Sequence, residues 1–507
     1  MNNLDSFGPL RRFMFPIHGS ELARFLPMAL MMLCVVFNYT VLRNFKDSLI
    51  VNAPGSDAAV ISFLKMWGTT PIAILFMLFY AKWVEKVGRE KMVYISLIPL
   101  CLFFVLFAFV LYPNRHTLHP TTERLLHLQE VWPHFKWWLA IWGNWIYSLF
   151  FLASELCGTI SLSLFFWQFA NAICDRSEAK RFYPLFGVIG NLGLILAGKL
   201  TEYYSRYSLE SELAASENWT HAIQVMLGLV SLSLITIQLF YYWLNRFLAK
   251  DPIVGPRLAQ SSGLPKRPRS PLIQSLRHVL SSPHLFYIAL LVFSYGLTIN
   301  FCDVLWKSEV KYFFKSNPAG YSAFMGHFSV IIGFLTIPLM LVSSHLLRRI
   351  SWISAAILPP LTMLVAGGGF FASIFWGLWT GPSHEWILAG VSITPLWLAV
   401  NFGFWQNALS KASKYSLFDP TKEMAYIPLS EEVKIKGKAA VDVVGARFGK
   451  TGGSLTFFLL QTFLPQLTLQ ELSPFIFTIF IAALGIWLIA LNRLQPLLNP
   501  TTADEAK

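Results

Sequence analysis

The residues best suited to chemistry lie inside an apolar stretch near the N-terminus, NYTVLRNFKDSLIV at residues 38–51. Helical spacing would bring Arg43, Lys46 and Asp47 within one turn. A charged side chain at membrane depth costs about 3 kcal/mol on insertion scales, so it normally faces a partner or a water-filled cavity. Lysine binds a multiply charged anion as a point charge, and arginine can grip one through two hydrogen bonds. The stretch therefore indicates a buried anion site.

The three charges need not share one role. Lys46 lies on nearly the same helix face as Asn38 and is the best placed for binding. Arg43 and Asp47 either assist it or form internal ion pairs that hold helices together. Because Lys46 and Asp47 are adjacent in sequence, we expect their side chains to point in different directions.

Further charges occur within or at the ends of later apolar runs: Glu155, Asp303, Lys307, Arg447 and Lys450. A lysine near a helix end can extend its ammonium group to the membrane surface, and this role is favoured for Lys307 and reasonable for Lys450. The turns GNLG and GKTGG could expose backbone N–H groups to an anion, although close helix packing is the commoner reason for glycine in membranes. GARFGKTGG lacks the spacing and the preceding strand of a phosphate loop, which argues against a nucleotidase.

The elements that must position these residues are membrane-spanning helices. The chain has 507 residues, of which 55% are hydrophobic and only 13% charged, and its apolar residues fall in runs long enough to span a bilayer. We predict an all-α polytopic membrane protein with twelve transmembrane helices in two six-helix halves, in the manner of major facilitators. The predicted spans are 26–50, 59–81, 92–112, 138–172, 182–200, 222–244, 284–305, 322–345, 352–376, 386–410, 446–464 and 474–492. The run 138–172 is too long for one straight helix, so it is tilted or extends beyond the membrane.

Loop charge predicts orientation. The segments 82–91, 173–181, 245–283 and 411–445 are basic and would lie on one side, which places both termini in the cytoplasm. The predicted organisation is a cytoplasmic N-terminus (1–25), a first bundle (26–244), a cytoplasmic linker (245–283), a second bundle (284–492) and a cytoplasmic tail (493–507). The net charge of +13 fits this topology or an anionic ligand, and nucleic-acid binding is not expected without a soluble domain.

Internal similarity supports two halves. FWQ occurs at 166–168 and at 404–406, FGVIGNLG resembles ARFGKTGG, and NYTVLRNFKDS loosely parallels NFCDVLWKSE, in the same order in each half. The five cysteines lie in or at the ends of apolar runs without a CxxC pair, which predicts neither a disulfide framework nor a metal site. The polar N-terminus lacks the features of a cleaved signal peptide, so we expect the first helix to remain inserted.

Several longer motifs resemble one family. FNYTVLRNFKDSLIVNAPGS, SELCGTISLSLFFWQFAN, INFCDVLWKSEVK, LFDPTKEMAYIPL and KIKGKAAVDVVGARFGKTGGS are similar to segments of the ATP/ADP translocases of obligate intracellular bacteria and plastids, with the chlamydial nucleotide transporters most alike. The resemblance covers nearly the whole chain. It implies a nucleotide transporter of the bacterial inner membrane that imports ATP in exchange for ADP by alternating access. It also implies that the protein is not an enzyme.

The resemblance also implies roles for residues. The family's functional charges match Lys46, Glu155, Asp303 and Lys450. Lys46 and Lys450 would bind phosphates, and Arg43 and Arg447 would assist them. Glu155, Asp303 and Asp47 would balance the positive charge, order the lysines or carry a proton. A base pocket would involve Asn38, Cys157, Gln168 and Asn300.

Departures from the family pattern leave an alternative open. Asp303 replaces a glutamate, Asn44 an acidic residue, Cys157 a tryptophan and Gln168 a glycine. The alternative is a proton-coupled importer of other nucleotides such as GTP or UTP, and a facilitator for another organic anion is less favoured because the motifs are specific. We expect no cofactor and no metal. The expected partners of this monomer are nucleotides, phosphate or protons, and the lipid bilayer.

Overall fold

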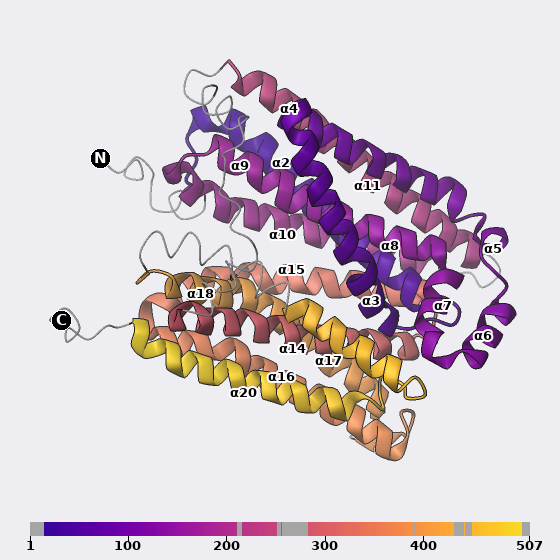
Figure 1. Cartoon of the computed structure of the whole chain (residues 1–507). Helices are drawn as coiled ribbons and strands as arrows, with labels where there is room; N and C mark the ends of the chain where they lie inside the picture. Colours follow the sequence, from indigo (N-terminus) through magenta and orange to yellow (C-terminus); the bar gives the residue numbers. More distant parts are fainter. Residues whose placement is uncertain are drawn as a thin grey trace.

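The computed structural model describes residues 15–209, 215–250, 255, 282–388, 391–429, 441 and 449–498. We refer to residues 15–250 as the N-terminal half and to residues 282–498 as the C-terminal half. Figure 1 shows the helices of the N-terminal half above those of the C-terminal half, with the start of α2 and the end of α20 at the same end of the bundle. We name this the terminal end and the opposite one the far end.

The N-terminal half is helical almost throughout. Its elements are η1 (Gly19–Glu21), α2 (Leu22–Val51), α3 (Ala59–Phe63), η2 (Leu64–Thr69), α4 (Thr70–Leu106), η3 (Phe107–Leu111), α5 (Arg115–Leu118), α6 (Thr122–Val131), η4 (Pro133–Phe135), α7 (Lys136–Gly143), α8 (Trp145–Gly158), η5 (Thr159–Phe166), α9 (Trp167–Ile173), α10 (Arg176–Tyr207) and α11 (Ala215–Leu248). The segments η2, η3 and η5 are π-helical, and such turns occur often at functional sites.

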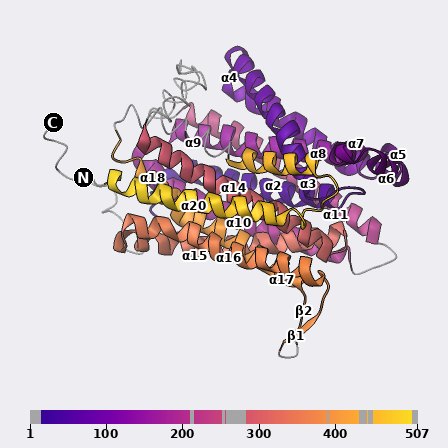
Figure 2. The ribbon, with the colours of Figure 1, turned by 60° about the horizontal axis from the view of Figure 1, so that its bottom comes forward.

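The C-terminal half contains α14 (Pro283–Phe313), α15 (Pro318–Arg349), α16 (Trp352–Thr380), β1 (Trp386–Leu388), β2 (Val391–Ile393), α17 (Pro395–Ser413), the π-helical η6 (Lys414–Phe418), α18 (Asp419–Ala425) and α20 (Ser473–Leu498), and residues 449–463 are also helical. Helix starts follow capping rules, since Asn317 accepts hydrogen bonds from the first turn of α15 and Ser351 caps α16 in the same way. The strands pair antiparallel in a hairpin that projects from the bundle in Figure 2.

Nine helices in the described ranges are long and apolar enough to cross a membrane. An all-α polytopic architecture is therefore confirmed, while the count of twelve spans stays a prediction. The second and third predicted spans lie in the stretch Ala59–Leu111, in which two helices meet at a kink at Gly88. The predicted loop 82–91 is therefore shorter in the structure: the residues around Gly88 are helical, and the chain turns at Gly88, whose φ of 81° suits glycine.

Three other boundaries differ from the sequence prediction. The predicted span 386–410 begins instead as the hairpin, and its helix starts at Pro395, where Thr394 accepts a hydrogen bond from the Trp397 N–H. The same helical course then continues to Ala425, so the first part of the predicted loop 411–445 belongs to the bundle. The long run 138–172 is interrupted at Asn144, which donates to the Pro54 carbonyl at 2.9 Å.

The two halves pack closely along α10 and α15. A Cβ atom on Gly326 would lie 2.6 Å from the Glu202 nitrogen, and one on Gly198 would lie 2.7 Å from the Gly326 carbonyl oxygen. Only glycine permits this approach of the two backbones, as is common between membrane helices. The contact holds α2 and α14, the helices with the buried charges, beside the junction of the halves.

Candidate functional site

Six charged side chains alternate in sign along a continuous path through the junction. We name this path the ion-pair chain, and its members in order are Glu155, Lys46, Asp47, Lys307, Asp303 and Lys411. They come from α8, α2, α14 and α17, so residues far apart in sequence meet at one place. Because each charge in the ion-pair chain has neighbours of opposite charge, their attraction offsets much of the free-energy cost of burying them.

The N-terminal half holds the first part of the ion-pair chain. Lys46 Nζ lies 2.9 Å from Glu155 Oε1 and 2.7 Å from Asp47 Oδ1. The expectation that Lys46 and Asp47 point in different directions is therefore wrong, because the long lysine side chain curves back to its neighbour. The side chain of Lys46 is only 5% exposed, so both carboxylates compete with any ligand for it.

The C-terminal half holds the rest. Lys307 Nζ lies 2.6 Å from Asp303 Oδ2, one helical turn earlier on α14, and 2.9 Å from Asp47 Oδ2 across the junction. Lys411 Nζ lies 3.8 Å from Asp303 Oδ1. The expectation that Lys307 extends to the membrane surface is wrong, because its side chain is 6% exposed and paired on two sides.

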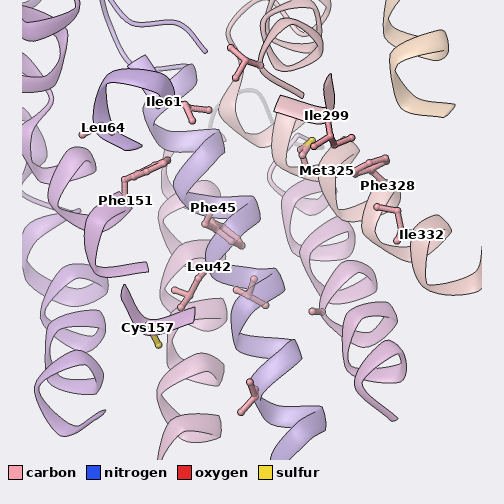
Figure 3. Close-up of a cluster of buried hydrophobic side chains, with 14 of the residues drawn as sticks. Leu42, Phe45, Ile61, Leu64, Phe151, Cys157, Ile299, Met325, Phe328 and Ile332 are labelled. Atoms are coloured by element: carbon pink, nitrogen blue, oxygen red, sulfur yellow. The ribbon is translucent and has the colours of Figure 1, made fainter. Parts of the chain in front are cut away.

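An apolar layer surrounds these charges. Figure 3 shows buried side chains from both halves around the junction, among them Phe45 of α2, Phe151 of α8 and Phe328 of α15. Lys46 Nζ lies 3.9 Å from the centre of the Phe151 ring, and Lys411 Nζ lies 4.8 Å from that of Phe328. Each ring presents its negative face to an ammonium group. These hydrophobic neighbours lower the local dielectric constant and strengthen every charge interaction in the site.

Two cations beside the ion-pair chain have no carboxylate partner in the described ranges. Arg43 Nη2 donates to Ser329 Oγ at 3.3 Å, and its buried Nε has no described partner. Lys65, on η2, lies within electrostatic reach of Lys46 and Lys307 but forms no described ion pair. The cluster thus places five cations beside three carboxylates, and this surplus suits a bound anion.

Lys450, another predicted phosphate ligand, is not a member of the ion-pair chain. Lys450 is exposed on the helix 449–463, whose backbone packs against Gly296 of α14. It forms no ion pair within the part of the chain that the structure describes. Arg447 lies outside the described residues.

The predicted base-pocket residues do not form one group. Asn38 is 1% exposed and neither polar atom of its amide has a described partner, two turns from Lys46 on α2. Cys157 is buried, with Sγ 3.8 Å from Ser161 Oγ. Asn300 contacts the helix 449–463, since a Cβ on Gly453 would lie 2.6 Å from its Oδ1.

Gln168 forms none of its described contacts with the ion-pair chain. It is exposed, and its Oε1 accepts a hydrogen bond from the Tyr80 hydroxyl at 3.4 Å. The thirteen positions that separate it from Glu155 correspond to a helical rise of about 20 Å.

Two lysines of the site, Lys411 and Lys65, escaped the sequence reasoning, and Lys307 was singled out but given a different role. Lys411 was assigned to a loop because the apolar run ends near it, and Lys307 was assigned to a helix end. Lys65 lies between Leu64 and Met66 within a predicted span, and a charge at that position was the available signal.

Polar contacts between the halves gather toward the far end. They pair one residue from each half: Ser48 Oγ with Pro318 O at 2.6 Å, Lys311 Nζ with Ser56 O at 2.5 Å, Tyr312 OH with Asp57 Oδ2 at 3.2 Å and Trp137 Nε1 with Gln461 Oε1 at 2.7 Å. The far end is therefore joined by direct contacts, and the ion-pair chain lies on the inner side of them.

Solved transporters share this fold. The chain is similar to a bacterial homologue of the iron transporter ferroportin in an inward-facing state (TM-score 0.61, 15% identity, 94% of this chain and 99% of that one). It is also similar to the xylose transporter XylE of E. coli in an inward open conformation (TM-score 0.53, 10% identity, 95% and 97%). These likenesses show the fold: a multi-pass helical bundle of the major-facilitator type.

Sequence comparison is more specific. A family model described as TLC ATP/ADP transporter matches residues 1–497, and the chain belongs to this family. It is 42% identical over 503 residues to ADP,ATP carrier protein 1 of Chlamydia trachomatis, covering 98% of this chain and 93% of the relative. It is 39% identical to the protein of that name from Rickettsia bellii (97% of each) and 38% identical to the chloroplastic one from Arabidopsis thaliana (97% and 76%). The resemblance seen in the sequence is confirmed.

Proposed function

We propose that this protein exchanges ATP for ADP across a bacterial inner membrane by alternating access. The observation that carries the proposal is the surplus of cations at the junction of the halves, where a polyanion would neutralise it. The names of its relatives, ADP,ATP carrier proteins, support the choice of nucleotide. The protein acts as a carrier and leaves its substrate chemically unchanged.

The proposed roles are those that the resemblance to the family implies. Lys46 and Lys450, one from each half, bind phosphates with Arg43 and Arg447, and the carboxylates of Glu155, Asp47 and Asp303 hold the lysines when no nucleotide is present. The terminal end faces the cytoplasm, in line with the basic loops. The protein works as a monomer, since one chain supplies both halves of the site.

Uptake by proteoliposomes tests the exchange. Vesicles loaded with unlabelled ADP, and empty vesicles, are offered labelled ATP, GTP, UTP and CTP. We expect ATP uptake only into loaded vesicles. Uptake of ATP into empty vesicles at the same rate would overturn exchange, and failure of ATP to enter either kind would overturn the choice of substrate.

A second candidate is proton-coupled nucleotide import, which Glu309 of α14 favours. This side chain is 4% exposed, its Oε1 has no described hydrogen-bond partner, and it forms no ion pair in the described ranges. A buried carboxyl without a cation is suited to gain and lose a proton as its surroundings change. Empty vesicles with an imposed pH gradient test it: accumulation that the Glu309→Gln variant loses would establish coupling, and no accumulation would exclude it.

A further inference from the structure

Carboxylates hold some cations of the site more firmly than others. The ammonium groups of Lys46 and Lys307 each contact two carboxylates at 2.9 Å or less, and their side chains are 5% and 6% exposed. Lys411 has a single carboxylate at 3.8 Å, on an aspartate whose other oxygen is 2.6 Å from Lys307, and its side chain is 22% exposed. An anion can therefore bind Lys411 while breaking fewer and weaker ion pairs than it would break by binding Lys46 or Lys307.

Lys65 interacts with the same aspartate, Asp303. Both Lys65 and Lys411 interact electrostatically with Asp303 and Lys307, although one comes from η2 of the N-terminal half and the other from α17. Lys411 is also repelled by Arg43 across the junction. An anion between these cations would relieve the repulsion and draw the two halves together.

Structural pairing does not account for these lysines. A lysine retained only to hold helices together would be matched by a carboxylate, because an unmatched ammonium group within apolar surroundings costs free energy. Lys65 is attracted by Asp303 and Glu155 but forms no ion pair with either in the described ranges, and the carboxylate partner of Lys411 is shared and distant. Their positions indicate a partner that arrives from outside the protein.

We infer that Lys65 and Lys411 bind the polyphosphate of the substrate and select it by its number of phosphates. This inference rests on the proposed function and deepens it. Two or three linked phosphates carry more negative charge than a single phosphate, so they can neutralise more of these cations. Lys46 and Lys307 then hold their helices, α2 and α14, in place through their ion pairs. They do so until a phosphate of the substrate displaces a carboxylate from one of these lysines.

Binding measurements on the purified full chain test the inference. The probes are ATP, ADP, AMP and inorganic tripolyphosphate, which carries the charges without a base. The variants are Lys65→Gln, Lys411→Gln and the charge-retaining Lys65→Arg and Lys411→Arg, with Lys199→Gln as the control because that side chain is 62% exposed on α10. We expect each glutamine variant to raise the Kd of ATP and tripolyphosphate about tenfold and that of AMP less than about threefold. The arginine variants should restore most of the affinity.

A measurement on the unmodified protein covers the case in which a glutamine variant does not fold. Amine-reactive labelling read by mass spectrometry should slow at Lys65 and Lys411 when tripolyphosphate is added, and remain unchanged at Lys199. Unchanged affinities or unprotected lysines, with ATP still bound by the original protein, would overturn this inference and leave the proposed function standing. If the original protein bound no nucleotide, the proposed function itself would fail, and the inference with it.

Discussion

Asp47 of α2 and Lys307 of α14 form the ion pair by which the ion-pair chain crosses between the halves, with Oδ2 and Nζ 2.9 Å apart. Each partner also has a second ion pair within its own half, Asp47 with Lys46 and Lys307 with Asp303. If the halves move apart at this level during transport, this contact must break, and a polyanion that takes over the lysine would compensate for the loss.

The Asp47–Lys307 pair should show strong energetic coupling. We expect Asp47→Ala or Lys307→Ala to destabilise the protein by about 3–5 kcal/mol, because each leaves a buried charge without its partner. The double variant should lose clearly less than the sum of the two. Thermal unfolding of detergent-purified protein in a double-mutant cycle measures this, and strictly additive losses would contradict the coupling.

Lys46→Ala should strongly reduce nucleotide exchange while membrane insertion remains intact. The substitution removes the cation between Asp47 and Glu155 and leaves two carboxylates facing the substrate's phosphates. We expect the rate of exchange in proteoliposomes to fall at least ~10-fold, as for a loss of ~1.4 kcal/mol or more. Lys199→Ala is the matched control, and normal transport by Lys46→Ala would remove this lysine from the site.

Gly326→Ala should weaken the packing between α10 and α15. The added methyl group would meet backbone atoms at 2.6 Å and 2.8 Å, which cannot move aside as a flexible side chain can. We expect a loss of about 2 kcal/mol, seen as a lower apparent Tm. Gly228→Ala on α11 is the control, since nothing lies within 4 Å of its added Cβ and helix propensity favours alanine by up to ~1 kcal/mol. Equal effects of the two variants would refute the close approach.

His119, in the segment between α5 and α6, should make stability depend on pH. Burial, together with neighbouring His116 and Arg115, lowers the pKa of its imidazole to about 4. The unfolded chain gains the proton near its ordinary pKa of 6.5, whereas the folded protein gains it only near 4, so stability should decrease as the pH falls from about 6.5 to 4. His119→Gln should reduce this pH dependence in thermal unfolding, and an unchanged profile would show that other groups cause it.

The sequence was informative wherever the free-energy cost of burying a charged side chain makes a single residue conspicuous. Arg43, Lys46 and Asp47 stood out because charge is rare inside a run of apolar residues, and the structure places all three at the junction. The sequence was misleading where the end of an apolar run was taken as the end of a helix. Lys411 follows such a run, yet the backbone stays helical through Ala425. The polar side chains of this segment lie inside a helix bundle instead of facing lipid, so they do not end the helix.

Hydropathy and motifs by themselves determined that this chain is an all-helical membrane transporter of the TLC ATP/ADP transporter family. A bilayer requires each spanning segment to satisfy its own backbone hydrogen bonds over about 20 apolar residues, and such segments can be read locally. Only the tertiary structure decided which charges meet. Asp47 and Lys307 are 260 positions apart, and the partner of a long, flexible side chain depends on which helices pack side by side.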